Sequence, residues 1–170
     1  MTISSIAALV ISLAACATDL RSRRIPNLLT LGAALAAFTF HLASNGTLGF
    51  TQSLLGWLLG AGVFFLPFAL GGLGGGDIKL LAALGAWLGP MPVLWLSMYT
   101  GVAGAVMAVV VSMRHGYLGQ ALRNIRLLLM HWRIRGLGPV DEITLAGSPG
   151  LKLAYALPIF AGTALTIWLQ

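Results

Sequence analysis

Long apolar stretches, separated by short polar or Gly/Pro-rich breaks, dominate the sequence and predict helices of membrane-spanning length. Six such stretches are present, and their predicted spans are 2–19, 28–44, 52–70, 78–89, 93–113 and 152–169. The break at 89–92, Gly-Pro-Met-Pro, divides an apolar run that is too long for one crossing. The pattern therefore predicts an all-α polytopic membrane protein with six transmembrane helices.

The basic residues give this six-span arrangement an orientation. Every Lys and Arg falls in the connections after spans one, three and five or within two residues of them, namely Arg21, Arg23, Arg24, Lys79, Arg114, Arg123, Arg126, Arg133, Arg135 and Lys152. Short connections rich in Lys and Arg stay on the cytoplasmic side of a membrane. We therefore expect both termini to lie on the opposite side, and the odd-numbered connections to face the cytoplasm.

The connection between spans five and six contains a further predicted helix, over 118–135. Its apolar residues recur at helical spacing, at Leu122, Ile125, Leu129 and Trp132. A neighbouring face carries Arg123, Arg126 and Arg133. This pattern is typical of an amphipathic helix that lies in the membrane interface against anionic lipid headgroups. A helix that binds a protein partner is the alternative interpretation.

Composition excludes a water-soluble domain. The hydrophobic share is 58%, and 10 basic plus 4 acidic residues make 14 charged positions in 170. A soluble domain has about a quarter of its residues charged. The net charge of +6 is explained by the orientation above, so we expect membrane lipids and no nucleic acid as partners. The single cysteine, Cys16, allows no internal disulfide, and no metal site or cofactor is predicted.

The acidic residues are few enough to consider one by one. Asp141 and Glu142 are adjacent in the long connection, whereas Asp19 closes span one and Asp77 opens span four, at the same predicted end. Span four has about 12 residues, or about 18 Å of helix, against a hydrocarbon core of about 30 Å. We therefore expect Asp77 to lie below the cytoplasmic surface, with the glycine-rich run 71–76 as non-helical backbone lining a wet cavity.

Two carboxyls held close together share a proton, so that one acts as a base and the other as an acid. Such a pair hydrolyses a peptide bond, because the ionised carboxylate activates a water and the protonated carboxyl polarises the carbonyl. Structural roles are the alternatives at this point. Asp77 would then only cap the start of span four, and Asp19 would only pair with Arg21 or Arg23.

Two segments resemble the signatures of the type IV prepilin peptidases, a family of GxGD-type intramembrane aspartyl peptidases. The first is 19–27, DLRSRRIPN, and the second is 74–83, GGGDIKLLAA. Only seven residues, 21–27, separate the first two spans, and this is similar to the short TadV/CpaA-like branch. The resemblance implies that Asp19 and Asp77 are catalytic. It also implies that the site is shaped by Gly74, Gly75, Gly76, Lys79, Arg21, Pro26 and Asn27.

The resemblance further implies a substrate and a location. The substrate is a prepilin, of the Flp type in this branch, whose basic leader is cleaved at the cytoplasmic face of a bacterial inner membrane. Both termini are then periplasmic, and the pilus assembly machinery is a further partner. We expect one peptidase domain over 1–170, without the cytoplasmic insertion associated with N-methyltransferase activity. The segment 152–162 departs from the family pattern, and no function is assigned to it.

Two other interpretations remain open on the sequence. In a small proton-coupled transporter subunit, Asp19 and Asp77 would relay protons. The halves 1–89 and 93–170 share no matching motif, which does not favour the internal repeats of many transporters. A catalytically inactive homologue that acts in pilus assembly is the third interpretation.

Overall fold

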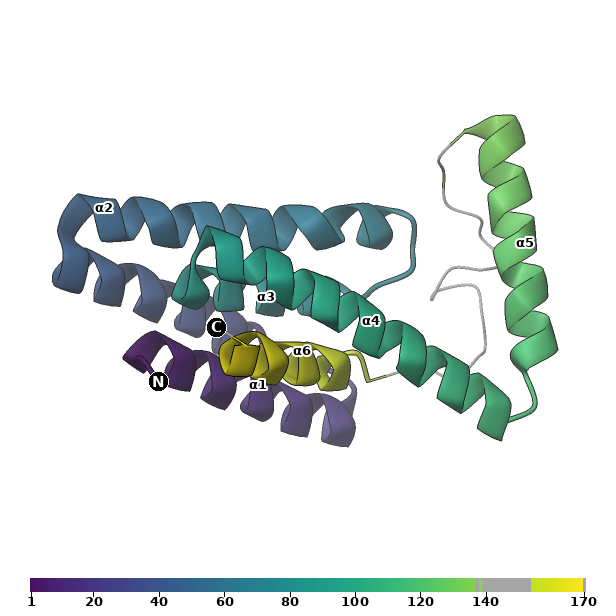
Figure 1. The fold of residues 1–170 in the computed structure, drawn as a ribbon, viewed down its shortest axis with the longest axis horizontal. Coiled ribbons are helices and arrows are strands. Elements are labelled where there is room, and N and C mark those ends of the chain that lie inside the picture. Colours follow the sequence, from purple (N-terminus) through teal and green to yellow (C-terminus); the bar gives the residue numbers. More distant parts are fainter. Residues whose placement is uncertain (137, 139–153, 170) are drawn as a thin grey trace.

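The fold is a helical bundle with one helix outside it, seen in a computed structural model (Figure 1). The structure describes residues 1–136, 138 and 154–169, and all regular secondary structure within them is helical. The helices are α1 (Ile3–Ser22), α2 (Asn27–Ala69), α3 (Gly75–Leu88), α4 (Pro90–Arg114), α5 (Leu118–Arg135) and α6 (Ala156–Leu169).

Helix α2 is folded back on itself, so that it supplies two of the predicted spans. The reversal occurs at Gly46, whose φ of 61° and ψ of −150° are not helical. The first arm (27–45) and the second arm (47–69) run side by side in Figure 1. The predicted break over 45–51 is therefore present but shorter than expected, because 47–51 is helical and the reversal lies at Gly46. One glycine suffices for the reversal, since it has no Cβ to oppose a positive φ.

The bundle helices alternate in direction and so define two ends. We call the end with the C-terminus of α1 and the N-termini of α3 and α6 the acid end, and the end with the Gly46 and Gly89 turns the turn end (Figure 1). The N-terminus of α1 and the C-terminus of α6 lie towards the turn end (Figure 1). Among the described residues, α1, α2 and α4 are long and apolar enough to cross a membrane, and α6 is a shorter apolar helix.

Helix α3 occupies the interior of this bundle. Its residues Leu80, Leu81 and Leu84 are fully buried. The second arm of α2 approaches it so closely that a Cβ on Gly56 would collide with the Gly85 carbonyl, and one on Gly85 with the Gly56 carbonyl. Such close backbone packing between apolar helices requires small residues. The position of α3, and of what it carries, is therefore fixed by glycine contacts.

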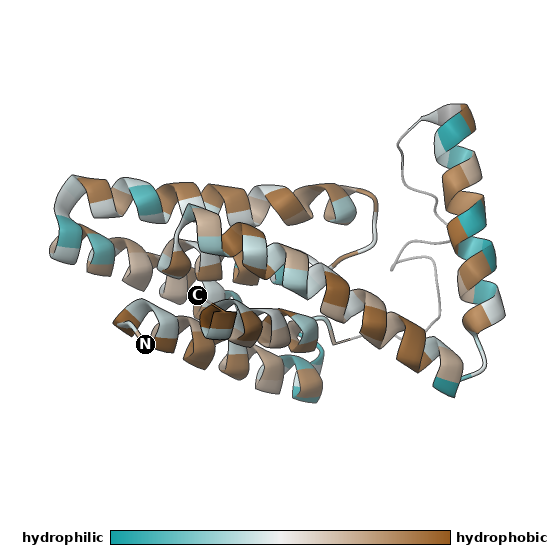
Figure 2. Cartoon of the chain, viewed as in Figure 1, coloured by the Kyte–Doolittle hydropathy of each residue, from teal (hydrophilic) through white to brown (hydrophobic). Residues whose placement is uncertain are grey.

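Helix α5 stands apart from the bundle, beyond the acid end (Figure 1). It spans Leu118–Arg135, so the predicted helix at 118–135 is present with the same limits. Figure 2 shows hydrophilic and hydrophobic residues mixed along it, whereas the bundle helices are mainly hydrophobic. Its apolar residues Leu122, Ile125 and Leu129 are all more than half exposed.

Candidate active site at the acid end

Two carboxylates are buried at the acid end. Asp19 lies in the last turns of α1 and Asp77 in the first turn of α3, with exposed fractions of 8% and 9%. The charge of Asp19 acts on the Asp77 carboxyl, so the two groups share one electrostatic environment. Carboxylates are rarely this buried unless they are hydrogen-bonded. The structure therefore brings together the two acids that the sequence places at the ends of separate spans.

Asp77 is hydrogen-bonded to the start of its own helix. The Gly74 N–H donates to its Oδ2 at 3.1 Å, and a Cβ on Gly74 would also lie 3.1 Å from that oxygen. Gly74 is thus the cap residue and Asp77 reaches back to it from the third helical position. The expectation that the whole run 71–76 is non-helical is wrong for Gly75 and Gly76. The Asp77 carboxylate stabilises the N-terminal turn, so the helix begins at Gly75.

Asp19 is hydrogen-bonded across the bundle. The N–H of Ala156, at the start of α6, donates to Asp19 Oδ2 at 3.2 Å. These residues are 137 positions apart in sequence. The bond uses a backbone N–H that every residue type except proline carries, so no sequence pattern marks it. The sequence assigned no function to the segment that contains Ala156, and the structure places it beside an acid.

Tyr155 also lies at this end of the bundle. Its ring meets Phe64 of the second arm edge-on, with centroids 6.2 Å apart. Its hydroxyl lies against Gly104 of α4, and the charge of Asp77 acts on the phenol. Tyr155 lies inside the predicted span 152–169, where an aromatic residue is an ordinary apolar position, so the sequence alone did not single it out.

The two sequence segments that flank the acids contact each other. The Lys79 ammonium donates to the Asn27 amide oxygen at 2.9 Å. A Cβ on Gly76 would lie 3.3 Å from the Ile25 side chain, so the chain before α2 packs on the first turn of α3. Pro26, which is exposed, is the cap residue of α2. Arg21, two residues after Asp19 on α1, is exposed. The link between α1 and α2 is short and holds Arg21 and Asn27 at the acid end.

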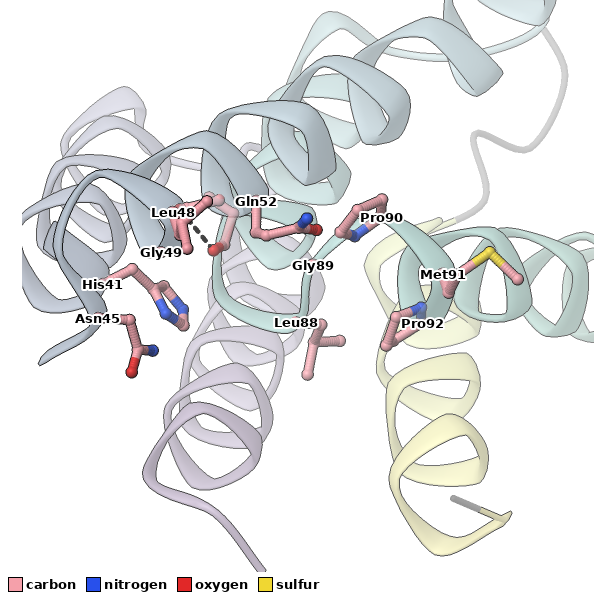
Figure 3. A pocket seen from close by; sticks show the side chains of 12 residues that line it. His41, Asn45, Leu48, Gly49, Gln52, Leu88, Gly89, Pro90, Met91 and Pro92 are labelled. Atoms are coloured by element: carbon pink, nitrogen blue, oxygen red, sulfur yellow. Dashed lines mark hydrogen bonds between the residues drawn. The ribbon is translucent and has the colours of Figure 1, made fainter.

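The opposite end of the bundle has a separate hollow, of about 480 Å³ (Figure 3). Its polar lining residues are His41, Asn45, Gln52 and Ser53, and its floor includes Gly89 and the prolines that begin α4. It contains no acidic or basic chain apart from the imidazole of His41. Across the described residues no cluster of three or more His, Cys, Asp or Glu side chains could hold a metal ion. The carboxylate chemistry is thus concentrated at the acid end.

Comparison with known proteins gives the family of the chain. Residues 6–109 match the model of the type IV leader peptidase family. The chain is also 36% identical over 115 residues to a prepilin leader peptidase/N-methyltransferase of Neisseria gonorrhoeae. That alignment covers 61% of this chain and 40% of the relative, so the chain spans less than half of the relative's length. No solved structure matches this chain. Because the matched family region covers more than half of the chain and includes both buried acids, the chain belongs to the type IV leader peptidase family.

Proposed function

We propose that this protein is an aspartic endopeptidase that removes the leader peptide of type IV prepilins, with Asp19 and Asp77 as its catalytic residues. The observation that carries the proposal is the pair of buried carboxyls at one end of the bundle, one charge acting on the other, inside the region that matches the family. Membership of the family supports prepilin processing. The relative is also named an N-methyltransferase, but the alignment covers only 40% of it. We therefore do not propose N-methyltransferase activity for this chain.

The chemistry needs only the two carboxyls and a water. The ionised carboxylate takes a proton from the water, whose oxygen attacks the scissile carbonyl carbon. The protonated carboxyl donates to the carbonyl oxygen and stabilises the tetrahedral intermediate. When the C–N bond breaks, a carboxyl proton passes to the leaving amine, and one shared proton remains on the pair. The Gly74 and Ala156 N–H groups hold the two carboxylates in place through this cycle.

The proposed membrane arrangement has six crossings, by α1, the two arms of α2, α3, α4 and α6. The basic residues at the acid end, including Arg21, Arg24 and Lys79, then face the cytoplasm. Both termini are periplasmic, in a bacterial inner membrane, and α5 lies in the cytoplasmic interface with its arginines at anionic headgroups. Reporter fusions test this orientation. A reporter that works only in the periplasm should be inactive when it is fused after residue 116. Activity of that fusion would contradict the proposed orientation.

The proposed substrate is a small, Flp-type prepilin with a basic leader before an apolar helix. An apolar substrate helix reaches the bundle by diffusing in the bilayer, and its scissile bond then lies at the depth of Asp19 and Asp77. Gly74 to Gly76 shape the site, because a Cβ at each position would meet Asp77, Phe68 or Ile25 within 4 Å. Lys79, Arg21, Pro26 and Asn27 shape the approach to the acids, and the pilus assembly machinery receives the product.

Co-expression with a candidate prepilin tests the proposal. Asp19→Asn and Asp77→Asn should each lower leader removal by about 100-fold or more, because general acid–base catalysis contributes on this scale. Asp141→Asn makes the same chemical change at a residue outside the described part of the chain, and should leave processing unchanged. The mass of the pilin reports both cleavage and methylation of the new N-terminus.

The outcomes separate the competing functions. Full processing by well-expressed Asp19→Asn or Asp77→Asn protein would exclude these acids as the catalytic pair. No processing by the wild-type protein, together with unchanged pilus assembly in both variants, would favour the inactive homologue. Proton uptake that both variants abolish, without any cleavage, would favour the transporter.

A further inference from the structure

Two consecutive residues where α6 begins, Tyr155 and Ala156, lie near the two acids. The Ala156 N–H donates to Asp19 Oδ2 at 3.2 Å. The preceding residue, Tyr155, experiences the charge of Asp77. Ala156 itself is fully buried, and its bond to Asp19 lies in the interior. A displacement of this short segment would therefore change the environment of the dyad directly.

The Tyr155 ring is held in a narrow space between two helices, and these contacts fix the segment. On one side it meets the Phe64 ring at an interplanar angle of 82°. On the other it crosses the backbone of α4 at Gly104, where an added Cβ would lie 2.6 Å from the hydroxyl oxygen and 3.0 Å from two ring carbons. Only glycine leaves enough room for the ring at this position of α4. Tyr155 is thus held between the second arm of α2 and α4.

We propose that Tyr155 is a positioning residue for Asp19, whose wedged ring fixes the start of α6 and so keeps the Ala156 N–H on the Asp19 carboxylate. The effect on catalysis rests on the proposed function, whereas the effect on Asp19 does not. An N–H to carboxylate bond is charge-assisted and is strengthened where water is excluded. Its loss would alter where the shared proton resides, without removing either catalytic carboxyl.

Substitutions on α4 test the wedge without touching the acids. Gly104→Ala adds a Cβ that must displace the Tyr155 ring, and should lower kcat for leader removal by about 10- to 100-fold, since small misplacements have effects of this size. KM should stay unchanged, because the substrate contacts remain. Gly101→Ala is the matched control. It makes the same change on the same helix, but its Cβ would meet nothing within 4 Å, and processing should be that of the wild type.

Substitutions of the tyrosine complete the series. Tyr155→Phe keeps the ring and should retain processing within about 3-fold, whereas Tyr155→Ala removes the wedge and should match Gly104→Ala. In the double variant Gly104→Ala with Tyr155→Phe, the oxygen 2.6 Å from the new Cβ is gone. Part of the lost kcat should therefore return. If Gly104→Ala is as active as Gly101→Ala, the proposal is overturned.

Carboxyl NMR gives a readout that is independent of peptidase activity. The chain has three aspartates, Asp19, Asp77 and Asp141, so selective ¹³C labelling yields three carboxyl signals that the Asn variants assign. Gly104→Ala and Tyr155→Ala should shift the Asp19 signal and leave the Asp141 signal in place. An unchanged Asp19 signal in folded variants of wild-type melting temperature would show that Tyr155 only fills space. This result counts against the wedge even if no prepilin is cleaved.

Discussion

The two ends of the bundle join distant segments with opposite chemistry. At the turn end, a hydroxyl and an imidazole lie at the last carbonyls of α3. The Ser53 hydroxyl donates to the Ala86 carbonyl at 2.7 Å, and the His41 imidazole lies 3.2 Å from the Trp87 carbonyl. At the acid end, carboxylates accept from the first N–H groups of α3 and α6. Each end thus pairs the backbone groups that a helix terminus leaves unsatisfied.

The difference follows from the helix dipole. The N-terminus of a helix is partially positive and the C-terminus partially negative, so anions are stabilised at the first and donors at the second. The acid end therefore keeps two carboxylates at helix N-termini, where reactive charge is useful. The turn end closes the bundle with hydroxyl, amide and imidazole side chains, and none of the described residues that line its hollow is acidic. Substitutions can therefore test whether the contacts at the turn end act independently of the carboxylates at the acid end.

The largest expected effect comes from the glycine contact that fixes α3 between the two ends. Gly85→Ala forces a Cβ into the Gly56 carbonyl, where backbone cannot yield easily, and should destabilise the protein by about 3 kcal/mol. Because α3 joins the two ends, the contacts at the acid end and at the turn end should be lost in the same unfolding transition. The melting temperature and yield in detergent measure this effect. Gly62→Ala is the control. Gly62 lies on the α2 arm that carries Gly56, its added Cβ would face open space, and the stability should hardly change.

A smaller effect should distinguish the turn end from the acid end. Ser53→Ala removes the buried bond to the Ala86 carbonyl and should cost about 1–2 kcal/mol of stability. Because Ser53 lies at the opposite end from Asp77, kcat for leader removal should not change at temperatures where the variant is folded. A fall in kcat as large as that of an acid-end variant would show that the two ends are not separate.

The smallest effect is expected at the rim of the acid end. Lys79→Ala and Asn27→Ala each break the exposed bond of 2.9 Å between α3 and α2. Exposed contacts of this kind contribute about 0.5 kcal/mol, so stability should hardly change. A double-mutant cycle should find a coupling of that size. A coupling energy of zero in both stability and processing would mean that this bond does not help to shape the site.

The sequence predicted most of the helices and the meeting of the acids. Apolar runs placed α1, α4 and α5 to within about three residues, which is ordinary for boundaries. The alternating basic residues predicted that Asp19 and Asp77 share one end, as the structure shows. These features follow from side-chain polarity, which periodicity and charge report directly.

The features that the sequence did not predict depend on the backbone. The sequence predicted a break over 45–51, but not that the reversal takes the single residue Gly46. The Ala156 N–H on Asp19 involves a main-chain group that carries no sequence signature. A partial signal existed for the helix contact, since Gly56 and Gly60 have the four-residue spacing typical of closely packed membrane helices. The spacing would have predicted a close partner, but not that the partner is Gly85 of α3.

The length of α3 has a consequence for which bond is cut. Its 14 residues make a helix of about 21 Å, shorter than the roughly 30 Å hydrocarbon core. Because α3 is enclosed by its neighbours, the bilayer of the proposed arrangement should adjust to α1, α2 and α4 and not to α3. In the proposed orientation, the depth of Asp77 is then a fixed property of the protein. If the proposed function holds, a substrate helix aligned with the same bilayer should be cut at a set distance from its membrane entry, and cleavage should be specified by depth as well as by residue type.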